Sequence, residues 1–584
     1  MLWDRLKNNL FILAIPLSIV IFYLSDHFPG SFLQKLFPLA LSTGCYFLMN
    51  GPAANAFIKS FSKKDKVIIL LIIIYAAFAF SGYNLYLSEY PVKNLFKKTV
   101  FFIAVGCWLS FITIAFLYFT ELCKQALFKQ TTPNNDARPS PTKLYFKFAG
   151  IMILCWLIYL AGFFPANMSA DSLVQWEQIT GVSQLNNWHP VFHTMFNKFF
   201  LSIYHNPVSV SLAQILFMAG IAANWFLFLY KKGVPEKWLI WASIVFGLIP
   251  ANGAYSVTLW KDIPFTFSLL WLTLVIAKIV SNDGYFKNKM AHIEVVAALV
   301  TAALFRHNGI PIYYLAIAAL LIYFYKFRKA GILVGVVVSL GLVLWYNHYI
   351  SDPARVVATP PAIKLVAPIH GMAAVRYYGG QLSAESTQEM EKVLPDSFWV
   401  NYYNPFSADE YIFNKMPFLQ NLSNLPTTKA ISLYANTFVH NPYLIIRDRL
   451  CGAELAWNVF EAPGAYNFKY HTQIDENAFG LKSGDNFLKK ILMFGLKASE
   501  KVADMFMWRA GIFNILVLLL LFLFLRHRQW YLLLFVPVLG SDAALLLSMT
   551  IQNYRYVYFV PMIFGFLWLL YISNFKSAGN RLKS

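Results

Sequence analysis

Long apolar runs separated by short polar stretches form the main pattern along this chain. Most runs are roughly twenty residues long, the length of helix that crosses about 30 Å of hydrocarbon. Inside lipid each backbone N–H and C=O must be paired within its own segment, so the runs are read as helices. The pattern predicts an all-α polytopic membrane protein with about fourteen spans. The predicted spans are 10–25, 32–49, 67–87, 97–121, 145–164, 207–230, 237–254, 263–280, 291–305, 309–325, 331–350, 511–525, 529–548 and 555–573.

Clusters of Lys and Arg occur in every second connection between the predicted spans. In membrane proteins such clusters mark the cytoplasmic connections. With the N-terminus inside, all of them fall on the cytoplasmic side, and the C-terminus is cytoplasmic as well. The clusters lie at 62–66, 124–143, Lys231 with Lys232, Lys287 with Lys289, 326–329, 526–528 and in the C-terminal tail.

The overall composition favours a membrane protein over a nucleic-acid-binding protein. Only 13% of the residues are charged, whereas a soluble chain carries about a quarter. The net charge of +20 then follows from the cytoplasmic clusters, and no nucleic-acid partner is expected. The five cysteines show no metal-binding spacing, and only Cys451 falls in the large outside segment, so no structural disulfide is expected. The first run lacks a clear cleavage site and is read as an uncleaved span.

A long outside segment and a polar linker divide the chain. The outside segment is too long for an ordinary connection and is predicted to be a mixed, mainly helical extracytoplasmic domain. The linker is rich in Pro, Asn and Thr. The predicted regions are an N-terminal four-span membrane region (1–128), the cytoplasmic linker (129–143), a membrane core with outside loops (144–350), the extracytoplasmic domain (351–510), and a C-terminal three-span region with a basic cytoplasmic tail (511–584).

Two acids lie in outside segments where predicted spans end or begin, the first in the long segment 165–206 and the second in a short loop. Asp171 follows the fifth span in SADSLVQW, and Asp262 begins the eighth span beside Lys261 in LWKDIPF. An acid at that depth needs solvent or a partner. Each also has a purely structural interpretation. Asp171 could only cap a helix, and Lys261 with Asp262 could be a charged pair that marks the interface.

Two arginines lie outside, against the charge bias. Arg306 belongs to RHNG, and Arg555 belongs to QNYRYVYF. A phosphate anion would explain such arginines, because guanidinium binds phosphate through two parallel hydrogen bonds. The alternative is an arginine that snorkels to the interface and is satisfied by carbonyl groups. His189 and His193, in WHPVFH, could bind phosphate or a metal, or be polar residues at an interface.

Together these side chains point to chemistry on a lipid-linked donor that carries phosphate. The predicted topology brings two acids and two arginines to one membrane face. A carboxylate can deprotonate an acceptor hydroxyl, and arginines can hold a leaving phosphate and stabilise its charge. The cytoplasmic segments contain no Gly-rich phosphate loop, so no soluble nucleotide donor is needed.

The motifs SADSLVQW, WHPVFHT and LWKDIPF resemble those of the GT-C class of polytopic glycosyltransferases, which includes the protein mannosyltransferases and the aminoarabinose lipid A transferases. The resemblance implies a GT-C-like core with Asp171 as catalytic base and Asp262 as a supporting acid. It implies a polyprenyl-phosphate sugar donor and transfer on the outer face. We expect the donor phosphate to be bound by Arg306, Arg555, Lys261 and His189.

The region 145–573 is also similar to a bacterial branch of this class. The similarity lies in RHNG, QLSAESTQEMEKVLP, YYNPFSADEY and QNYRYVYF, and it implies a multi-pass protein of the bacterial plasma membrane. The chain departs from the class in having four extra spans before the core and a single acid in the first-loop motif. Glu177 is the nearest other acid. A divalent metal normally takes several oxygen ligands, and this motif has a single acid. Binding of Mg²⁺ or Mn²⁺ is therefore left open.

Six further residues are candidates for substrate binding, because aromatic faces stack on sugar rings and charged groups bind sugar or phosphate. They are His193 and Glu177 in the first loop, and Arg376, Tyr377, Trp457 and Glu461 in the extracytoplasmic domain. The alternative for most of them is that they pack this domain onto the membrane helices.

The predicted function is transfer of a sugar from a polyprenyl-phosphate donor to a cell-envelope glycan, lipid or protein. One alternative is a flippase or transporter for a lipid-linked glycan, which should carry ionisable residues near the midplane of its spans. Another is an enzyme that polymerises or ligates oligosaccharides and uses 351–510 to bind an extended acceptor. The four extra spans could dock a partner, such as the membrane enzyme that makes the donor.

Overall fold

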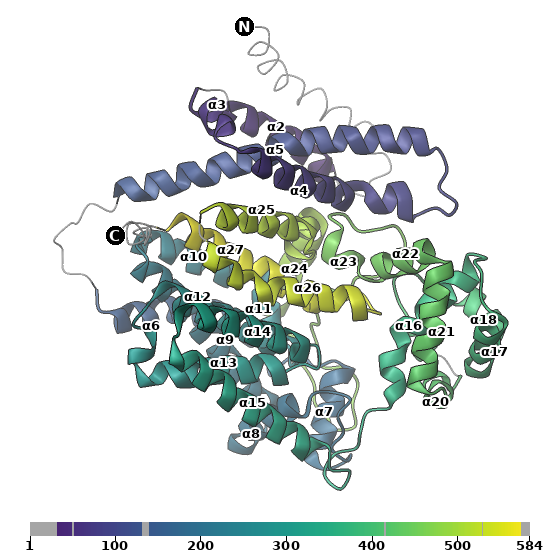
Figure 1. The fold of residues 1–584 in the computed structure, drawn as a ribbon. Helices are drawn as coiled ribbons and strands as arrows, with labels where there is room; N and C mark the ends of the chain where they lie inside the picture. Colours follow the sequence, from purple (N-terminus) through teal and green to yellow (C-terminus); the bar gives the residue numbers. More distant parts are fainter. Residues whose placement is uncertain (1–31, 50–51, 131–138, 414–415, 528, 574–584) are drawn as a thin grey trace.

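The protein is a bundle of helices with a helical lobe at one end (Figure 1). The computed structural model describes residues 32–49, 52–130, 139–413, 416–527 and 529–573. These residues form helices and isolated β-bridges but no strand. Among them ten helices are long and apolar enough to span a membrane, or eleven when a bent pair is counted as one span. The predicted all-α polytopic class is confirmed.

The helices form three groups in Figure 1. The N-terminal group is α2 (Phe32–Met49), α3 (Pro52–Lys59), α4 (Lys63–Gly82) and α5 (Leu95–Gln130). The central chain contributes α6 (Pro141–Gly162), α9 (Pro207–Lys231), the bent pair α10 (Glu236–Leu248) and α11 (Pro250–Ser256), α12 (Asp262–Ser281), α13 (Lys289–Leu304), α14 (Gly309–Phe327) and α15 (Ala330–Ile350). The C-terminal group is α24 (Phe487–Met507), α25 (Gly511–His527), α26 (Val536–Ser548) and α27 (Phe559–Ile572).

Among the described residues fewer than fourteen helices are long and apolar enough to span a membrane, for identifiable reasons. The predicted span 10–25 lies outside the described residues. The runs 32–49 and 291–305 form α2 and α13, but neither helix is among the ten. α13 has 16 residues and rises only about 24 Å. α24, which the sequence placed in the extracytoplasmic domain, precedes α25 in one long apolar segment, 487–527.

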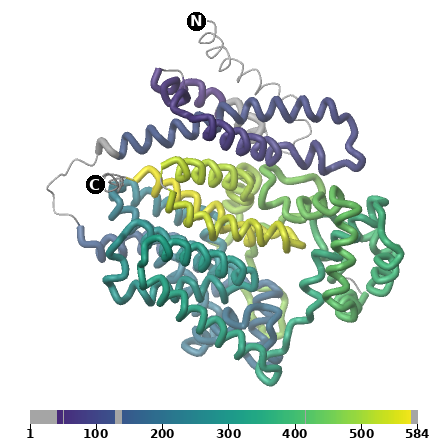
Figure 2. Tube along the Cα trace, viewed as in Figure 1, coloured from purple at the N-terminus to yellow at the C-terminus, as the bar shows by residue number. Residues whose placement is uncertain are grey.

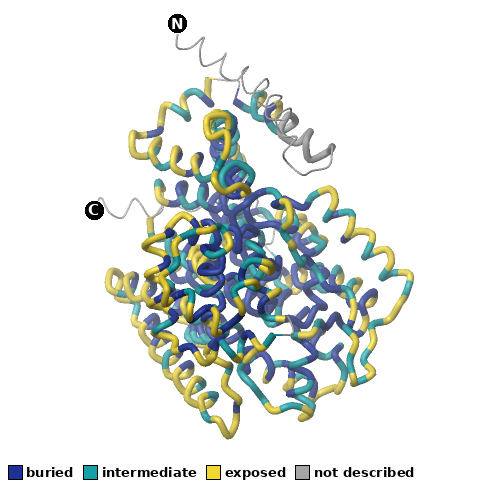
Figure 3. The backbone as a smooth tube through the Cα atoms, turned by 90° about the vertical axis from the view of Figure 1, so that its right-hand side faces the viewer, coloured by how far each residue is buried: buried dark blue, intermediate teal, exposed yellow. Residues whose placement is uncertain are grey.

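The most buried helix of the bundle is α12. Nearly all of its side chains are buried, because it packs against α9 and α13 on one side and against α26 and α27 on the other. A helix that is apolar all round belongs in the middle of a bundle. Figure 3 shows the buried residues gathered in the centre and the exposed ones along the outline. The start of α12, at Asp262, is therefore held by protein on every side.

Helix ends that the sequence predicts on the same side of the membrane contact each other at each end of the bundle. At one end Arg526 lies 3.9 Å from Asp65, and Lys147 lies 2.7 Å from Glu236. At the other end Arg447, in α22 (Pro442–Gly452), donates from Nε to the carbonyl of Leu87 at 2.8 Å. The short helix α13 crosses between these ends, so it does reverse the chain direction as a span would.

The predicted domain 351–510 is divided between two cores. Residues between 362 and 433 enclose an apolar core of their own, whereas residues 451–462 and parts of α24 belong to the core of the bundle. The lobe in Figure 1 contains α16 (Val366–Tyr377), α17 (Ala384–Val393), α18 (Asp396–Asn401), α19 (Asp409–Ile412), α20 (Phe418–Ser423), α21 (Thr427–His440) and α22. The separate part of the predicted domain is thus smaller than expected.

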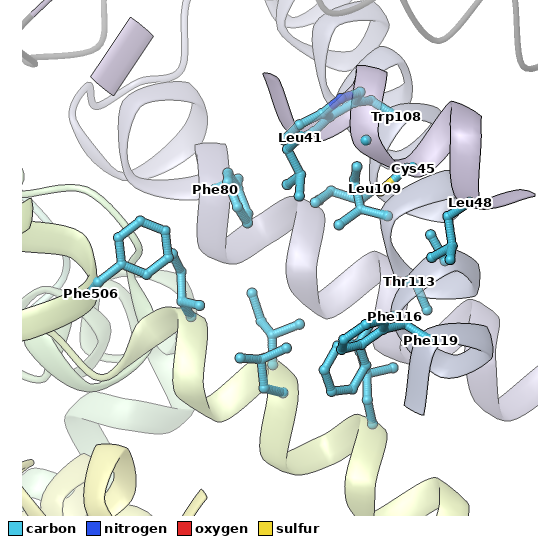
Figure 4. A pocket seen from close by; sticks show the side chains of 17 residues that line it. Leu41, Cys45, Leu48, Phe80, Trp108, Leu109, Thr113, Phe116, Phe119 and Phe506 are labelled. Carbon is cyan, nitrogen blue, oxygen red and sulfur yellow. The ribbon is translucent and has the colours of Figure 1, made fainter. Parts of the chain in front are cut away.

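The four N-terminal helices pack onto the C-terminal group. α4 contacts α25, and α5 contacts α27, so helices from the N-terminal and C-terminal groups lie side by side (Figure 2). An apolar cavity of about 430 Å³ lies between α2, α5 and the start of α25. Figure 4 shows Cys45, Trp108 and Phe506 around this cavity. The N-terminal region shares the main apolar core instead of forming a separate unit.

Candidate active site

Four segments that are far apart in the sequence meet at the lobe end of the bundle. Isolated backbone bridges join Asn167 with Thr258, Met168 with Ile474, and Phe468 with Asn553. Each bridge lies within four residues of a charged or aromatic side chain of the site described below. The backbone therefore fixes the relative positions of these side chains before any side-chain contact is made.

Asp171 lies in the first turn of α7 (Ala170–Thr180). Its Oδ2 atom is 3.0 Å from Arg555 Nη2 and 3.4 Å from Lys261 Nζ. The N-cap residue of α7 is Ser169, which makes no capping hydrogen bond and instead accepts one from Trp260 Nε1 at 2.8 Å. The carboxylate of Asp171 thus faces two cations, which a simple helix cap would not require.

Asp262 is the first residue of α12, and its side chain is fully buried between two arginines. Oδ1 lies 3.1 Å from Arg306 Nε, and Oδ2 lies 3.4 Å from Arg555 Nε. Neither contact is aligned as a hydrogen bond, and both oxygens lack a hydrogen-bond partner among the described residues. The charges compensate each other nonetheless, since an unpaired buried carboxylate would be very costly. Arg555 reaches both acids and so links them.

Aromatic rings hold the two arginines. The guanidinium of Arg555 lies over Trp260, 4.5 Å from the ring centroid, and that of Arg306 lies over Tyr556 at 4.4 Å. Such cation–π contacts occupy the flat faces of the guanidinium groups. The N–H groups at the edges of each guanidinium can therefore bind anions that lie in the guanidinium plane.

The charge of this cluster is net positive. Three cations, Lys261, Arg306 and Arg555, surround two carboxylates, which leaves a net charge of +1. Burial would raise the pKa of Asp171, but the charges of Lys261 and Arg555 outweigh it and hold that pKa well below its ordinary value. In this arrangement Asp171 is ionised and is a weak base.

His189 lies beside Lys261 and orients it. The ammonium of Lys261 donates to His189 Nδ1 across 3.0 Å. Burial, together with the charge of Lys261, lowers the pKa of His189 to about 3. The imidazole is therefore neutral at pH 7, with its proton on Nε2. Its contribution is to fix the position of the ammonium that contacts Asp171.

His193 is enclosed within the packing of α8 (Val191–Ile203). Its Nδ1 atom is 3.0 Å from Gln175 Oε1, and Gln175 donates to Thr194 at 2.9 Å. Burial lowers the pKa of His193 to about 3. This histidine joins α8 to α7, as the structural alternative expects, and supports the turn that carries Asp171.

Three predicted substrate-binding residues lie apart from this cluster. Glu177 is six residues after Asp171 and so faces another side of α7. Arg376 forms a two-pronged contact with Asp396, at 2.6 Å for each nitrogen. Tyr377 packs against Tyr403 with 4.9 Å between ring centroids. Arg376 and Tyr377 therefore stabilise the lobe.

Trp457 and Glu461 lie where the lobe joins the bundle. Trp457 stacks on Phe78 of α4 with 4.8 Å between ring centroids. Glu461 lies 3.4 Å from Lys469 Nζ. Trp457 therefore packs its segment onto the bundle, which is the structural role that the sequence left open.

The sequence did not reveal the segment 468–475 as part of the site. His471 in this segment lies 3.2 Å from Asp475, and its ring centroid is 6.2 Å from that of Trp260. Burial lowers the pKa of His471. No motif marks this segment, so its position follows only from the backbone bridges that it makes with Met168 and Asn553.

The residues of the cluster do not fit a bound divalent cation. Mg²⁺ and Mn²⁺ take about six oxygen ligands, whereas only two carboxylates are present, and cations already contact both. Among the described residues no group of three His, Cys, Asp or Glu could hold a metal ion. The cluster suits an anion better than a cation, because its net charge is positive.

An apolar groove lies in the same part of the chain as the segment that carries Arg555. Its volume is about 500 Å³, and it lies between α10 and α27. The end near the site is lined by Asn252, Tyr554 and Tyr558, and the far end by Trp238 and Trp568. Tyr558 donates to Asn252 at 2.6 Å. Tyr554, at one end of this groove, is the residue before Arg555, and the groove follows α27 for about 16 Å from Tyr558 to Leu569. The side chains of the charged cluster do not line it.

No family model, curated protein or solved structure matches this chain.

Proposed function

We propose that this protein transfers a sugar from a polyprenyl-phosphate donor to an acceptor hydroxyl at the outer face of the bacterial plasma membrane. The observation that supports it most is the contact of Arg555 with both Asp171 and Asp262. Through it, two acids and three cations form one cluster, and the residue before Arg555, Tyr554, lines an apolar groove. A lipid-linked phosphate needs this combination, with cations for its head and an apolar path for its chain.

Donor binding starts with the cations. The phosphate of the donor enters beside Arg555, Arg306 and Lys261, whose net excess of positive charge it neutralises. The guanidinium groups bind phosphate oxygens in their own planes, while Trp260 and Tyr556 cover their faces. The polyprenyl chain lies in the groove between α10 and α27, where its burial contributes roughly 25 cal/mol per Å².

The phosphate then changes the chemistry of Asp171. It shares Arg555 and Lys261 with the carboxylate and adds a negative charge nearby, and both effects raise the pKa of Asp171. The carboxylate becomes a stronger base only when the donor is in place. Asp171 takes the proton of the acceptor hydroxyl while the oxygen of that hydroxyl bonds to C1 of the sugar. The C1–O bond to phosphate breaks, and its electron pair goes to the phosphate held by the cations.

Asp262 has a supporting role in this proposal. It is buried between Arg306 and Arg555 and keeps both guanidinium groups at the end of α12. Without Asp262 the guanidinium groups of Arg306 and Arg555 would repel each other and move apart. The outer location of the site is part of the proposal, and it is supported by the basic clusters of the sequence, which mark the opposite end of the bundle as cytoplasmic.

The experiment that tests this function is sugar transfer by purified protein in vesicles that contain polyprenyl-phosphate sugars. Asp171→Asn should lower the rate by about 10²–10⁴-fold, the usual contribution of a general base. The amount of the Asp171→Asn variant in the membrane should equal that of the wild type. Asp352→Asn, which changes an exposed acid in the loop after α15, is the matched control and should keep full activity.

Full activity of Asp171→Asn would rule out this carboxylate as the base. Movement of the intact donor across the vesicle membrane without sugar transfer would instead identify a flippase. The size of the product separates addition of one sugar from polymerisation or ligation of oligosaccharides.

A further inference from the structure

Helix α24 crosses the lobe end of the bundle and does not run through it. Before its start, Asn486 Nδ2 donates to the carbonyl of Ala161 at 3.1 Å, at the end of α6. After its end, Arg509 Nε donates to the carbonyl of Asn458 at 3.2 Å, beside the start of α25. The segment 487–527 has 41 residues, about twice the length of a span, and the 17 residues of α25 are enough to cross the hydrocarbon. α24 is therefore a helix on the surface of this end.

One side of α24 exposes large apolar side chains, and we call it the apolar face. Phe487, Ile491 and Phe494 follow at intervals of four and three residues, so they lie on the same side of the helix. The exposed fractions of these residues are 77%, 49% and 76%. The opposite side of α24 carries the buried residues Leu496 and Ser499. An exposed apolar patch of this kind marks a surface that binds lipid or protein.

Three lysines follow one edge of the apolar face, and we call them the lysine edge. Lys490, Lys497 and Lys501 are all exposed. Their intervals of seven and four residues place them in one row along the helix. The apolar face is thus bordered on one side by three positive charges.

The inner side of α24 reaches the candidate active site. Its two carboxylates, Glu500 and Asp504, lie 3.2 and 2.7 Å from Lys469 Nζ. Because both acids contact Lys469, they do not pair with the lysine edge. The neighbouring residue Phe468 forms the backbone bridge with Asn553. α24 therefore supports a segment of the site from behind.

The head-group layer of a membrane suits both the apolar face and the lysine edge. From Lys490 to Lys501 the helix rises about 16 Å, so a position within the hydrocarbon would bury lysines at high cost. A position in water would leave the apolar face exposed. At the interface the apolar side chains enter the acyl boundary, while the lysines meet the phosphates of anionic lipids.

We propose that α24 lies on the membrane leaflet at the lobe end of the bundle and binds anionic phospholipids there. The apolar face contacts the acyl boundary, and the lysine edge binds the lipid phosphates. This surface is separate from the proposed transfer reaction. Through Glu500 and Asp504, it holds the segment 468–475 at a fixed depth relative to the membrane.

The first test measures the depth of the apolar face in vesicles of phosphatidylcholine and phosphatidylglycerol that contain the full-length protein. A nitroxide is attached to Phe494→Cys in a variant whose five native cysteines are replaced by alanine. Its collisions with oxygen, which concentrates in lipid, are compared with its collisions with a water-soluble nickel chelate. The nitroxide should collide mainly with oxygen. The matched control is Ala384→Cys, exposed in the lobe, whose nitroxide should collide mainly with the chelate.

The second test measures which lipid lies beside α24. A fluorophore replaces the nitroxide on Phe494→Cys, and its quenching by phosphatidylglycerol and by phosphatidylcholine is compared when either lipid carries a nitroxide on its acyl chain. Phosphatidylglycerol should quench more strongly. Adding Lys490→Gln with Lys497→Gln should reduce this preference towards one, by up to roughly fivefold for each lysine. The matched control, Lys392→Gln with Lys429→Gln on the lobe, should keep the full preference.

Three results would overturn the proposal. Collisions of the Phe494→Cys nitroxide mainly with the chelate would place α24 in water. Collisions with neither reagent would show that protein, such as a second copy of this chain, covers the apolar face. An unchanged preference for phosphatidylglycerol after Lys490→Gln with Lys497→Gln would show that the lysine edge does not bind lipid phosphates.

Discussion

At the scale of single residues, Asp171 and Asp262 share Arg555 but differ in burial. The side chain of Asp171 is 35% exposed, whereas that of Asp262 is fully buried. Water can therefore replace a partner lost at Asp171 but not one lost at Asp262. The two acids should respond differently to the same substitution.

Asp262→Asn should destabilise the protein by about 3–5 kcal/mol, because it leaves Arg306 without its carboxylate partner and Arg555 with Asp171 alone. A lower melting temperature of the purified variant would show this, while Asp171→Asn should melt close to the wild type. Adding Arg306→Gln to Asp262→Asn removes one unpaired charge and should restore part of the loss. Equal melting temperatures for Asp262→Asn and the wild type would contradict this account.

The two buried histidines predict how stability depends on pH. The pKa of His189 and of His193 falls to about 3 in the folded protein, from 6.5 when exposed. Below pH 6.5 the unfolded chain takes up protons that the folded protein cannot, so stability is complete above pH 6.5 and falls towards pH 3. At pH 5 each histidine should cost about 2 kcal/mol.

Melting temperatures measured from pH 7.5 to pH 5 check this prediction. The wild type should melt at a lower temperature as the pH falls, and His193→Gln should have a flatter profile. A wild-type melting temperature that is constant across this range would show that these histidines are not buried as neutral groups.

The sequence located the charged residues of the site but not their neighbours. Arg306 and Arg555 could be found because they break the charge bias, and Asp171 and Asp262 because they lie at the ends of apolar runs. Tyr556 and His471 have no such signal, since an aromatic or a histidine near a membrane surface is common. Their place becomes visible only when distant segments are brought together.

At the scale of elements, short helices were the hardest to predict. α13 is shorter than a normal span, yet it crosses the bundle, because its neighbours α12, α14 and α15 surround it. α24 was assigned to the outside domain, although its mixed lysines and apolar residues fit a helix packed on α6 and α11. Sequence length and composition do not report on such neighbours.

One pair of contacts joins the N-terminal helices to the lobe. Arg447 donates to the carbonyl of Leu87 at 2.8 Å, and Tyr443 donates to that of Tyr86 at 2.9 Å. Replacing both, as Arg447→Met with Tyr443→Phe, should loosen this junction by roughly 1–3 kcal/mol. Hydrogen exchange of residues 83–87 should become about tenfold faster or more.

The lobe core between residues 362 and 433 is the internal control, since its exchange should be unchanged by these substitutions. Unaltered exchange at residues 83–87 would show that other contacts, such as the stacking of Phe78 on Trp457, are sufficient to hold the junction.

At the scale of the whole molecule, the two ends of the bundle should lie on opposite sides of the membrane. Single cysteines can test this in a variant whose five native cysteines are replaced by alanine. A membrane-impermeant maleimide should label Ala384→Cys, which is exposed in the lobe, in intact cells. Lys326→Cys, exposed at the other end, should be labelled only after the cells are permeabilised.

The opposite labelling pattern would place the Asp171 cluster in the cytoplasm and overturn the proposed outer-face reaction. Labelling of both positions in intact cells would show that the cells leak, and labelling of a known cytoplasmic cysteine protein in the same sample detects this directly.

The backbone bridges at the site also have a consequence for synthesis of the protein. Asp171 is made early, but Phe468, Asn553 and Arg555 follow hundreds of residues later. Lys261 follows Asp171 early in synthesis, but Arg555, which contacts both acids, comes only with the last span. The link between Asp171 and Asp262 therefore forms only after residue 555 has been made, so the charged cluster is among the last features of the fold to be completed.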